Sequence, residues 1–305
     1  MDRLDAMAVF VAAVDEGSLS AASRRLQMPL ATVSRKLAEL EAHLGTRLVT
    51  RSTRQLALTE AGRDYLVAAR EILERVDEAE RGAAGVQAAP RGELIVAAPL
   101  VFGRLHVVPV VADYLARFAD VNVRLLLSDR NANLLEEHVD AALRIGTLPD
   151  SGLVALRIGE IRRVACASPA YLAARGTPST PDELRGHCCV NFEGLGGASA
   201  WSFPVGDTSQ RVAVRTRLSV TTADAAIRAA EAGVGITRVL SYQVAEALRA
   251  GRLVRVLTAH EPPAVPVSLL YSRQGRLPMK TRSFLDFATP RLQAALRDQA
   301  PSTEH

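Results

Sequence analysis

The alternation of apolar and polar positions is most regular between residues 18 and 58. Four apolar residues recur at intervals of four, three and four positions, which places them on one face of a helix: Val33, Leu37, Leu40 and Leu44. A shorter helix before it buries three small or aliphatic residues, Leu19, Ala22 and Leu26. After Gly45, residues 47–58 alternate weakly around a Ser-Thr turn, which predicts a short hairpin.

An amphipathic helix over residues 4–16 precedes these elements, and Gly17 ends it. Three helices followed by a hairpin predict a winged helix-turn-helix, in which the second of two closely joined helices enters the major groove of DNA. A three-helix domain with a solvated basic face is the alternative. We therefore assign residues 1–59 to one small, α-rich domain.

A long helix is predicted from Thr59, which can cap it, to Gln87. Its apolar residues are spaced alternately four and three apart and form a heptad seam: Tyr65, Ala69, Ile72, Val76, Ala79, Ala83 and Val86. The seam joins two copies of the chain, or it packs the helix on the C-terminal domain of its own chain. Charged residues elsewhere on the helix favour the dimer. We assign residues 60–89 to a linker helix and hinge.

From Glu93 onward, strands alternate with helices, which is typical of an α/β domain. The predicted strands are 94–98, 121–127, 141–145, 164–167, 212–216, 218–220, 234–239 and 265–271. The predicted helices are 103–118, 134–138, 169–175, 223–232, 242–250 and 278–297. We expect one α/β domain, 90–300, with two lobes: lobe I of about 90–161 and 266–300, and lobe II of about 162–265.

Positive charge is concentrated in the N-terminal domain. Residues 18–58 hold seven basic and two acidic side chains, a local net charge of +5 against +4 for the whole chain. Contacts to DNA phosphates require such an excess. Candidate contacts with double-stranded DNA lie on the helix starts, the polar face of the second helix and the hairpin: Ser18, Ser20, Thr32, Ser34, Arg35, Lys36, Arg51, Thr53 and Arg54.

The rest of the composition argues against other classes of protein. Charges interrupt the N-terminus and no apolar stretch has the length of a membrane span, so we expect a cytoplasmic protein with no membrane partner. His187, Cys188 and Cys189 are consecutive, and neighbours in a strand point to opposite faces, so we expect no metal there. Cys166 either packs in the core or lies near a ligand. Nucleotide-binding loops and metalloprotease motifs are absent, and we predict no catalytic residue and no cofactor.

Residues 1–60 resemble the N-terminal domain of LysR-type transcriptional regulators, through GSLSAASRRL, ATVSRKLAELEAHLGTRLVTR and LALTEAG. Residues 93–297 resemble the effector-binding domain of the same family, itself similar to periplasmic solute-binding proteins. The matching segments there are GELIVAAPLVFGR, LLLSDR, DAALRIGTLPDSGLVALRIG, ACASPAYL and EAGVGI. One departure is Pro29 and Leu30, where the family usually has a Ser cap and a Gln.

The resemblance implies a sequence-specific transcriptional regulator whose operator binding or activation responds to a small-molecule effector of unknown identity. It also implies a homodimer through the linker helix, a homotetramer, and RNA polymerase as a further candidate partner. A solute-binding protein of the periplasmic-binding-protein type is the alternative, and the DNA-binding motif argues against it.

Candidate effector-binding residues lie where the predicted strands end and helices begin: Pro99, Leu100, Val101, Phe102, Ser128, Arg144, Gly146, Thr221, Thr222 and Gly235. For an anionic effector, the helix start after Pro99 would offer N–H groups and Arg144 a positive charge. Arg144 is alternatively a structural partner of Asp140. Trp201 and Phe203 either line the ligand pocket or fill lobe II.

Overall fold

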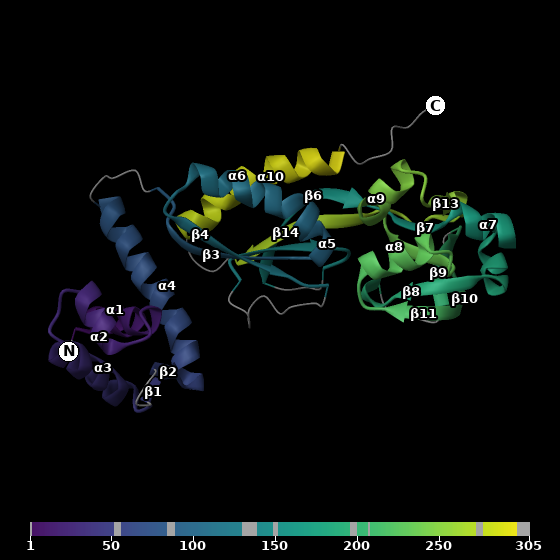
Figure 1. Cartoon of the computed structure of the whole chain (residues 1–305). Coiled ribbons are helices and arrows are strands. Elements are labelled where there is room, and N and C mark those ends of the chain that lie inside the picture. Colours follow the sequence, from purple (N-terminus) through teal and green to yellow (C-terminus); the bar gives the residue numbers. More distant parts are fainter. Residues whose placement is uncertain are drawn as a thin grey trace. The chain divides into compact units, whose positions relative to one another are not determined.

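The computed structural model of the chain describes residues 2–51, 56–83, 89–129, 139–148, 152–195, 200–206, 208–272 and 277–297. The chain divides into two compact units, Met1–Ala89 and Pro90–His305 (Figure 1). Each unit has its own apolar clusters, so each is described by itself.

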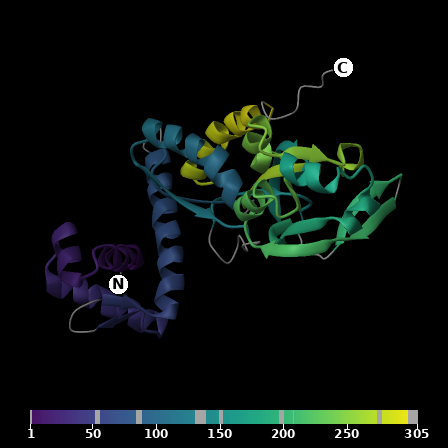
Figure 2. The same cartoon turned by 45° about the vertical axis from the view of Figure 1, so that its right-hand side comes forward.

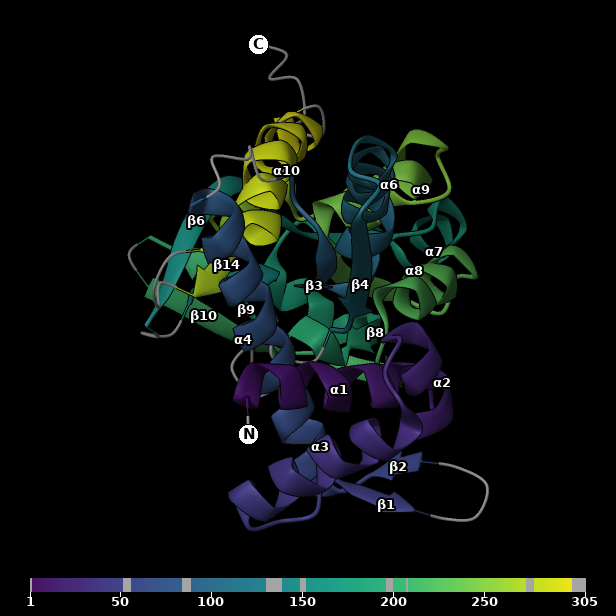
Figure 3. The same ribbon diagram turned by 90° about the vertical axis from the view of Figure 1, so that its left-hand side faces the viewer.

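The N-terminal unit combines helices with a two-stranded sheet (Figure 3). Its elements are α1 (Arg3–Asp15), α2 (Leu19–Arg25), α3 (Leu30–Leu44), β1 (Val49–Arg51), β2 (Leu56–Leu58) and α4 (Glu60–Ala83). β1 and β2 are antiparallel, with Val49 opposite Leu58. α1 packs against both α3 and α4. The predicted winged helix-turn-helix with a following linker helix is therefore confirmed.

The apolar row predicted on α3 forms the core of this unit. Val33, Leu37 and Leu40 are fully buried, and each such side chain contributes about 1.5–3 kcal/mol to stability. Leu37 and Leu40 pack with Phe10 of α1. The last residue of the row, Leu44, is 37% exposed because α3 ends there.

In the C-terminal unit, lobe I is built on a five-stranded sheet in the order β4-β3-β5-β14-β6. Its elements are β3 (Gly92–Ala98), α5 (Leu100–Phe102), a π-helical turn (Gly103–Val107), α6 (Val108–Arg117), β4 (Val121–Leu127), β5 (Ala141–Ile145), β6 (Leu153–Ile161), β14 (Val265–Ser272) and α10 (Met279–Arg297). β3 runs parallel to β4 and β5, whereas β14 runs antiparallel to β5 and β6.

Lobe II is built on a second five-stranded sheet, in the order β11-β8-β12-β7-β13, with a separate hairpin β9–β10. Its strands are β7 (Arg163–Ala167), β8 (Cys188–Phe192), β9 (Ala200–Val205), β10 (Thr208–Ala213), β11 (Arg215–Val220), β12 (Ile236–Leu240) and β13 (Val254–Val256). Its helices are α7 (Pro169–Arg175), α8 (Ala223–Glu231) and α9 (Ser241–Arg249), with 3-10 turns at Pro181–Gly186, Glu193–Leu195 and Thr258–His260. Figure 2 shows lobe II in green beside lobe I, which is blue and yellow.

The lobe II sheet separates two apolar clusters, because alternate side chains of a strand point to opposite faces. One cluster joins Val164, Cys166, Val190 and Val239 to buried residues of α8 and α9. The other joins Ala165, Cys189 and Ile236 to the β9 residues Trp201 and Phe203. Trp201 and Phe203 are only 2% and 3% exposed, so they fill lobe II, which decides between the two predicted roles.

Several elements of this unit differ from the sequence-based expectation. The predicted strand 212–216 is wrong, because β10 ends at Ala213 and β11 begins at Arg215. Strands β6, β9 and β13 were not predicted; β6 has three exposed residues in succession, which hides its alternation. The predicted helix 134–138 and the end of the linker helix, 84–87, lie outside the described residues.

Candidate functional site

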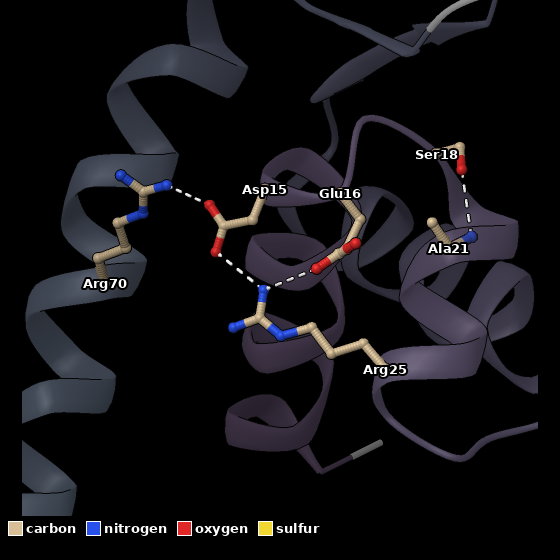
Figure 4. Close-up of polar contacts among 6 residues, drawn as sticks. All are labelled: Asp15, Glu16, Ser18, Ala21, Arg25 and Arg70. Atoms are coloured by element: carbon tan, nitrogen blue, oxygen red, sulfur yellow. Dashed lines mark hydrogen bonds and ion pairs between the residues drawn. The ribbon is translucent and has the colours of Figure 1, made fainter.

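Helices α2 and α3 are joined by a turn that hydrogen bonds hold closed. The hydroxyl oxygen of Ser18 caps α2 by accepting the N–H of Ala21 at 3.1 Å (Figure 4). In the turn, the Ser23 hydroxyl donates to the Met28 carbonyl at 2.6 Å, and Gln27 has a left-handed conformation with φ 53°. The connection between the two helices is therefore as tight as the sequence predicts.

Helix α3 begins with an exposed apolar residue. Leu30, the first residue of the helix, is 46% exposed, although it continues the row of Val33 and Leu37 by the helical period. Arg35 follows on the helix, with its guanidinium 2.7 Å from Glu39 and its side chain 65% exposed. Three other predicted DNA contacts on α2 and α3 are exposed or half-buried: Ser20, Thr32 and Ser34. The start of α3 thus offers an apolar side chain to a partner, and its outer face offers a positive charge.

Lys36 does not share that face. Its ammonium group lies 2.8 Å from the Asp5 carboxylate of α1, and its side chain is only 17% exposed. A lysine that is paired and mostly covered is a poor contact for a DNA phosphate, contrary to the expectation from the sequence.

A buried carboxylate attaches the hairpin to α3. Glu41 is 9% exposed, and its Oε1 accepts the N–H groups of Leu48 at 2.8 Å and Val49 at 3.1 Å. Hydrogen bonds to an ionised acceptor are among the strong ones, so this side chain orients the start of β1 relative to α3. The predicted contacts at the hairpin tip lie outside the described residues: the side chain of Arg51, Thr53 and Arg54.

The start of α4 lies against the same segment. The Thr59 hydroxyl oxygen accepts the N–H of Gly62 at 2.9 Å, which confirms the predicted cap. The same hydroxyl donates to the Arg47 carbonyl at 2.7 Å. A Cβ atom at Gly62 would lie 1.9 Å from the Leu48 carbonyl oxygen, so only glycine allows α4 to come this close.

An ion-pair network joins α1, α2 and α4 (Figure 4). Asp15, at the end of α1, accepts a hydrogen bond from Arg70 of α4, and its second oxygen lies 3.5 Å from the Arg25 guanidinium of α2. The same guanidinium lies 3.3 Å from Glu16. Exposed pairs of this kind contribute about 0–1 kcal/mol each, so they orient α4 more than they stabilise it.

The predicted heptad seam of α4 divides into two parts. The Tyr65 ring lies 5.8 Å from that of Phe10, centroid to centroid, and Ala69 is fully buried. These two residues cover α1 of their own unit, an arrangement that neither alternative from the sequence included. Ile72 is 40% exposed and Val76 is half-buried. The surface left for a partner helix therefore begins at Ile72.

In the C-terminal unit, the helix start after Pro99 is already occupied by a carboxylate. The N–H of Leu100 donates to Asp129 Oδ1 at 3.0 Å, and Asp129 Oδ2 is buried without a hydrogen-bond partner. The side chains of Val101 and Phe102 are fully buried in the apolar core. An anion at this helix start would face the Asp129 carboxylate, and the predicted role of these residues towards an effector stays a prediction.

The two lobes of the C-terminal unit touch through a small aromatic and ionic contact. The Phe102 ring meets the Tyr242 ring of α9 edge-on at a centroid distance of 5.4 Å. Arg104 lies 3.1 Å from Asp224 of α8. Burial raises the pKa of the nearby Asp129, and the negative charge of Asp224 raises it further, against the lowering effect of the Leu100 hydrogen bond.

The other predicted effector residues differ in their surroundings. The Thr222 hydroxyl oxygen caps α8 by accepting the Ala225 N–H at 3.4 Å. A Cβ atom at Gly235 would lie 2.2 Å from the Cys188 carbonyl oxygen, so only glycine allows this close approach to β8. Gly146 has φ 110° with open space around it. Two more of the set are exposed, Ser128 and Thr221.

Arg144 lies on β5 opposite Ser268 and is half-buried. Asp140, its alternative structural partner, accepts the Ile95 N–H at 2.8 Å and lies 3.9 Å from the Lys280 ammonium group. The role of Arg144 towards an effector stays a prediction.

A pocket of about 640 Å³ lies elsewhere, along α10. Apolar lining residues include Leu156, Leu285 and Pro290, and the lining also contains the charged residues Arg282 and Asp286. The predicted effector residues are not part of this lining.

The three cysteines are free and buried. Burial raises the pKa of Cys166 and of Cys189 to about 12, which keeps both thiols protonated at neutral pH. In the part of the chain that the structure describes, three or more His, Cys, Asp or Glu side chains are nowhere arranged to hold a metal ion. Within the same residues, a helix long and apolar enough to span a membrane is not found, although α1 and α2 pass that test as a pair bent by 117°.

Two family models match the chain. The model of the bacterial regulatory helix-turn-helix protein of the lysR family matches residues 4–63, and the model of the LysR substrate binding domain matches residues 87–293. The chain belongs to the LysR family of transcriptional regulators. The predicted family and function are confirmed, and the alternative of a solute-binding protein is not supported.

The curated relatives of this LysR-type regulator are transcriptional regulators, and the similarity covers nearly the whole of each protein. An HTH-type transcriptional repressor of Pseudomonas aeruginosa is 35% identical over 289 residues, which cover 94% of this chain and 91% of that protein. CrgA of Neisseria meningitidis serogroup B is 33% identical over 290 residues, which cover 94% of this chain and 96% of CrgA.

Solved structures show the same order of domains. The structure of CrgA from Neisseria meningitidis matches with a TM-score of 0.60 and 31% identity, over 94% of this chain and 98% of that chain. The full-length virulence activator AphB of Vibrio cholerae matches with a TM-score of 0.59 and 27% identity, over 93% of this chain and 98% of that chain. The regulator therefore has the two-part fold of its family.

Sequence reasoning about this regulator missed Glu41, Gly62 and Asp129. Glu41 follows Leu37 by four positions, so the helical period already places it on the buried face. An acidic residue on such a face needs partners, and this signal could have found it. Gly62 and Asp129 carry no comparable signal, because each acts on a segment that only the fold brings near.

Proposed function

We propose that this regulator reads its operator through the outer face of α3, with the hairpin β1–β2 beside it on the DNA. The observation that carries the proposal is the exposed Arg35 on the face of α3 opposite its fully buried row, with the exposed Leu30 at the start of the same helix. An apolar side chain can contact the methyl group of thymine, and a guanidinium can bind guanine bidentately. Glu41 holds the hairpin at the end of this helix.

The experiment measures binding to a duplex that the parent protein has selected from a random pool. Arg35→Ala should weaken this binding by about 1–3 kcal/mol, with most of the loss at one base pair of the site. Arg157→Ala is the matched control, since Arg157 is also 65% exposed and paired along its own element, but lies in lobe I. Equal binding by the parent and both variants would contradict the proposal.

We further propose that a small-molecule effector binds where the two lobes meet. Support comes from Asp129 Oδ2, a buried acceptor without a hydrogen-bond partner beside the lobe–lobe contact. A ligand group that donates a hydrogen bond would satisfy this oxygen, whereas an anion would be repelled by it. A thermal-shift screen that compares amines and amides with carboxylates tests this, because a ligand of the native state raises the melting temperature.

Assembly is proposed to use two surfaces. Ile72 and the following apolar residues of α4 would pair two copies as a homodimer. A second apolar surface lies on α6 and the π-helical turn before it, where Leu105, Val108 and Leu115 are 41%, 45% and 37% exposed. This surface supports a homotetramer. RNA polymerase stays a predicted partner from the family. Because its target is DNA, we expect the regulator to act in the cytoplasm, and as its relatives are regulators we propose no catalytic activity.

A further inference from the structure

Two arginines share one face of the lobe II sheet. In the antiparallel pair β12–β7, Arg238 lies opposite Ala165, and Leu240 lies opposite Arg163. Arg163 and Arg238 are therefore diagonal neighbours on adjacent strands, a spacing of about 7–8 Å that long side chains can bridge. Residues two apart on a strand share a face, so both arginines lie on the side of Ala165 and Ile236, the side covered by β9.

Neither guanidinium has an acidic partner within the described residues. The Nε of Arg163 is buried and makes no hydrogen bond. Two half-buried positive charges side by side repel each other, and an unsatisfied buried N–H carries a further cost. An anion bound between the two groups would relieve this repulsion and satisfy the buried N–H.

Aromatic side chains hold one of these groups in place. The guanidinium carbon of Arg238 lies 5.0 Å from the ring centroid of Trp201 and 5.9 Å from that of Phe203. Its Nη1 donates to the Ser202 carbonyl at 3.2 Å. Burial and the neighbouring charge of Arg163 lower the pKa of Arg238 to about 10, so it remains protonated at neutral pH. A fixed guanidinium with unused donors is prepared to bind a carboxylate or phosphate oxygen pair.

We propose that Arg163 and Arg238 form an anion-binding site on lobe II that takes a small oxyanion, such as a carboxylate or a phosphate. The site is separate from the proposed effector site. The effector would lie by α9, whose Tyr242 belongs to the apolar cluster on the opposite face of the sheet. Arg163 follows directly on Arg162, whose carbonyl accepts the Ser241 N–H at 2.8 Å near the chain crossing from lobe I.

The chain provides its own probe, because Trp201 is its single tryptophan and lies in the site. Tryptophan fluorescence of the full-length protein is measured during titration with sodium phosphate, sodium sulfate and sodium acetate. Sodium chloride keeps the ionic strength constant throughout. We expect a saturable change in fluorescence, with the tetrahedral and the planar anions distinguished by their half-saturating concentrations.

Arg163→Gln and Arg238→Gln should each raise the half-saturating concentration about tenfold or more. Arg211→Gln is the matched control, since Arg211 is exposed on the hairpin strand β10 and should leave the titration unchanged. Arg238→Gln loses its contact with two buried rings, so circular dichroism checks its fold, and Arg163→Gln provides an independent result. A parent protein with no saturable change, or Arg163→Gln with the parent's response, would overturn the proposal. Neither outcome affects the thermal-shift test of the effector site.

Discussion

The two units of this regulator position their binding groups over very different chain distances. In the N-terminal unit, Glu41 reaches the hairpin over seven and eight residues. In the C-terminal unit, Arg104 and Asp224 meet across 120 residues, and Asp129 reaches the start of α5 across 29. A DNA-reading face can thus be held by one helix and its immediate neighbours, whereas a ligand site between lobes depends on the order of strands. Substitutions should therefore act on one unit and spare the other.

The largest effect is expected on assembly. Ile72→Glu together with Val76→Glu places like charges on the exposed part of the α4 seam, and burying unpaired charge costs several kcal/mol. The double variant should dissociate, as seen by light scattering, while its far-ultraviolet circular dichroism stays that of the parent. Arg75→Glu, which changes an exposed neighbour off the seam, is the control. If the double variant keeps the parent's mass, the seam packs within one chain.

Two glycines, one in each unit, allow a matched test of whether the two units unfold independently. Gly62→Ala forces a Cβ atom against the Leu48 carbonyl, at 1.9 Å in the present backbone, and Gly235→Ala does the same against Cys188 at 2.2 Å. Each should destabilise its own unit by about 3 kcal/mol. Calorimetry should show Gly62→Ala lowering one transition and Gly235→Ala the other. A single transition lowered equally by both would mean that the units unfold together.

A medium effect is expected at the attachment of the hairpin. Glu41→Ala leaves the N–H groups of Leu48 and Val49 unsatisfied, at a cost of about 2 kcal/mol in the free energy of unfolding. Glu41→Gln keeps an acceptor and should recover part of that loss. DNA affinity should fall with Glu41→Ala although Glu41 touches no DNA. Unchanged stability and affinity would show that the hairpin is held in another way.

The smallest effect concerns Asp129. Because its pKa is raised in the folded state, the ionised side chain destabilises the fold above that pKa, and the penalty disappears below the unfolded value of about 3.8. Asp129→Asn keeps an acceptor for Leu100, so it should melt about 2 °C above the parent at pH 8. This advantage should shrink as the pH is lowered towards 4. An advantage that does not depend on pH would exclude ionisation as its cause.

Predictability from sequence follows the same division between near and distant contacts. The buried row of α3 and the Thr59 cap depend on a helical period and on one turn, which the residues themselves display. Strand β6 was not predicted because it lies at the edge of its sheet, where exposed residues follow one another and buried and exposed positions do not alternate regularly. Of the predicted effector residues, Val101, Phe102 and Gly235 proved to be packing residues, since strand ends carry core and cleft side chains in the same pattern.

Local periodicity and motif spacing determined the family, the helix-turn-helix, the linker helix and the two-lobed α/β domain, because these signals lie within single elements and short motifs of the chain. Tertiary structure alone decided that Tyr65 covers its own unit and that Asp129 occupies the start of α5. It also decided that Arg163 and Arg238 come together with no acidic partner among the residues that the structure describes. The physical reason is that charge and burial depend on which strands become neighbours. That choice is made by the packing of the whole domain and leaves no repeat in the chain.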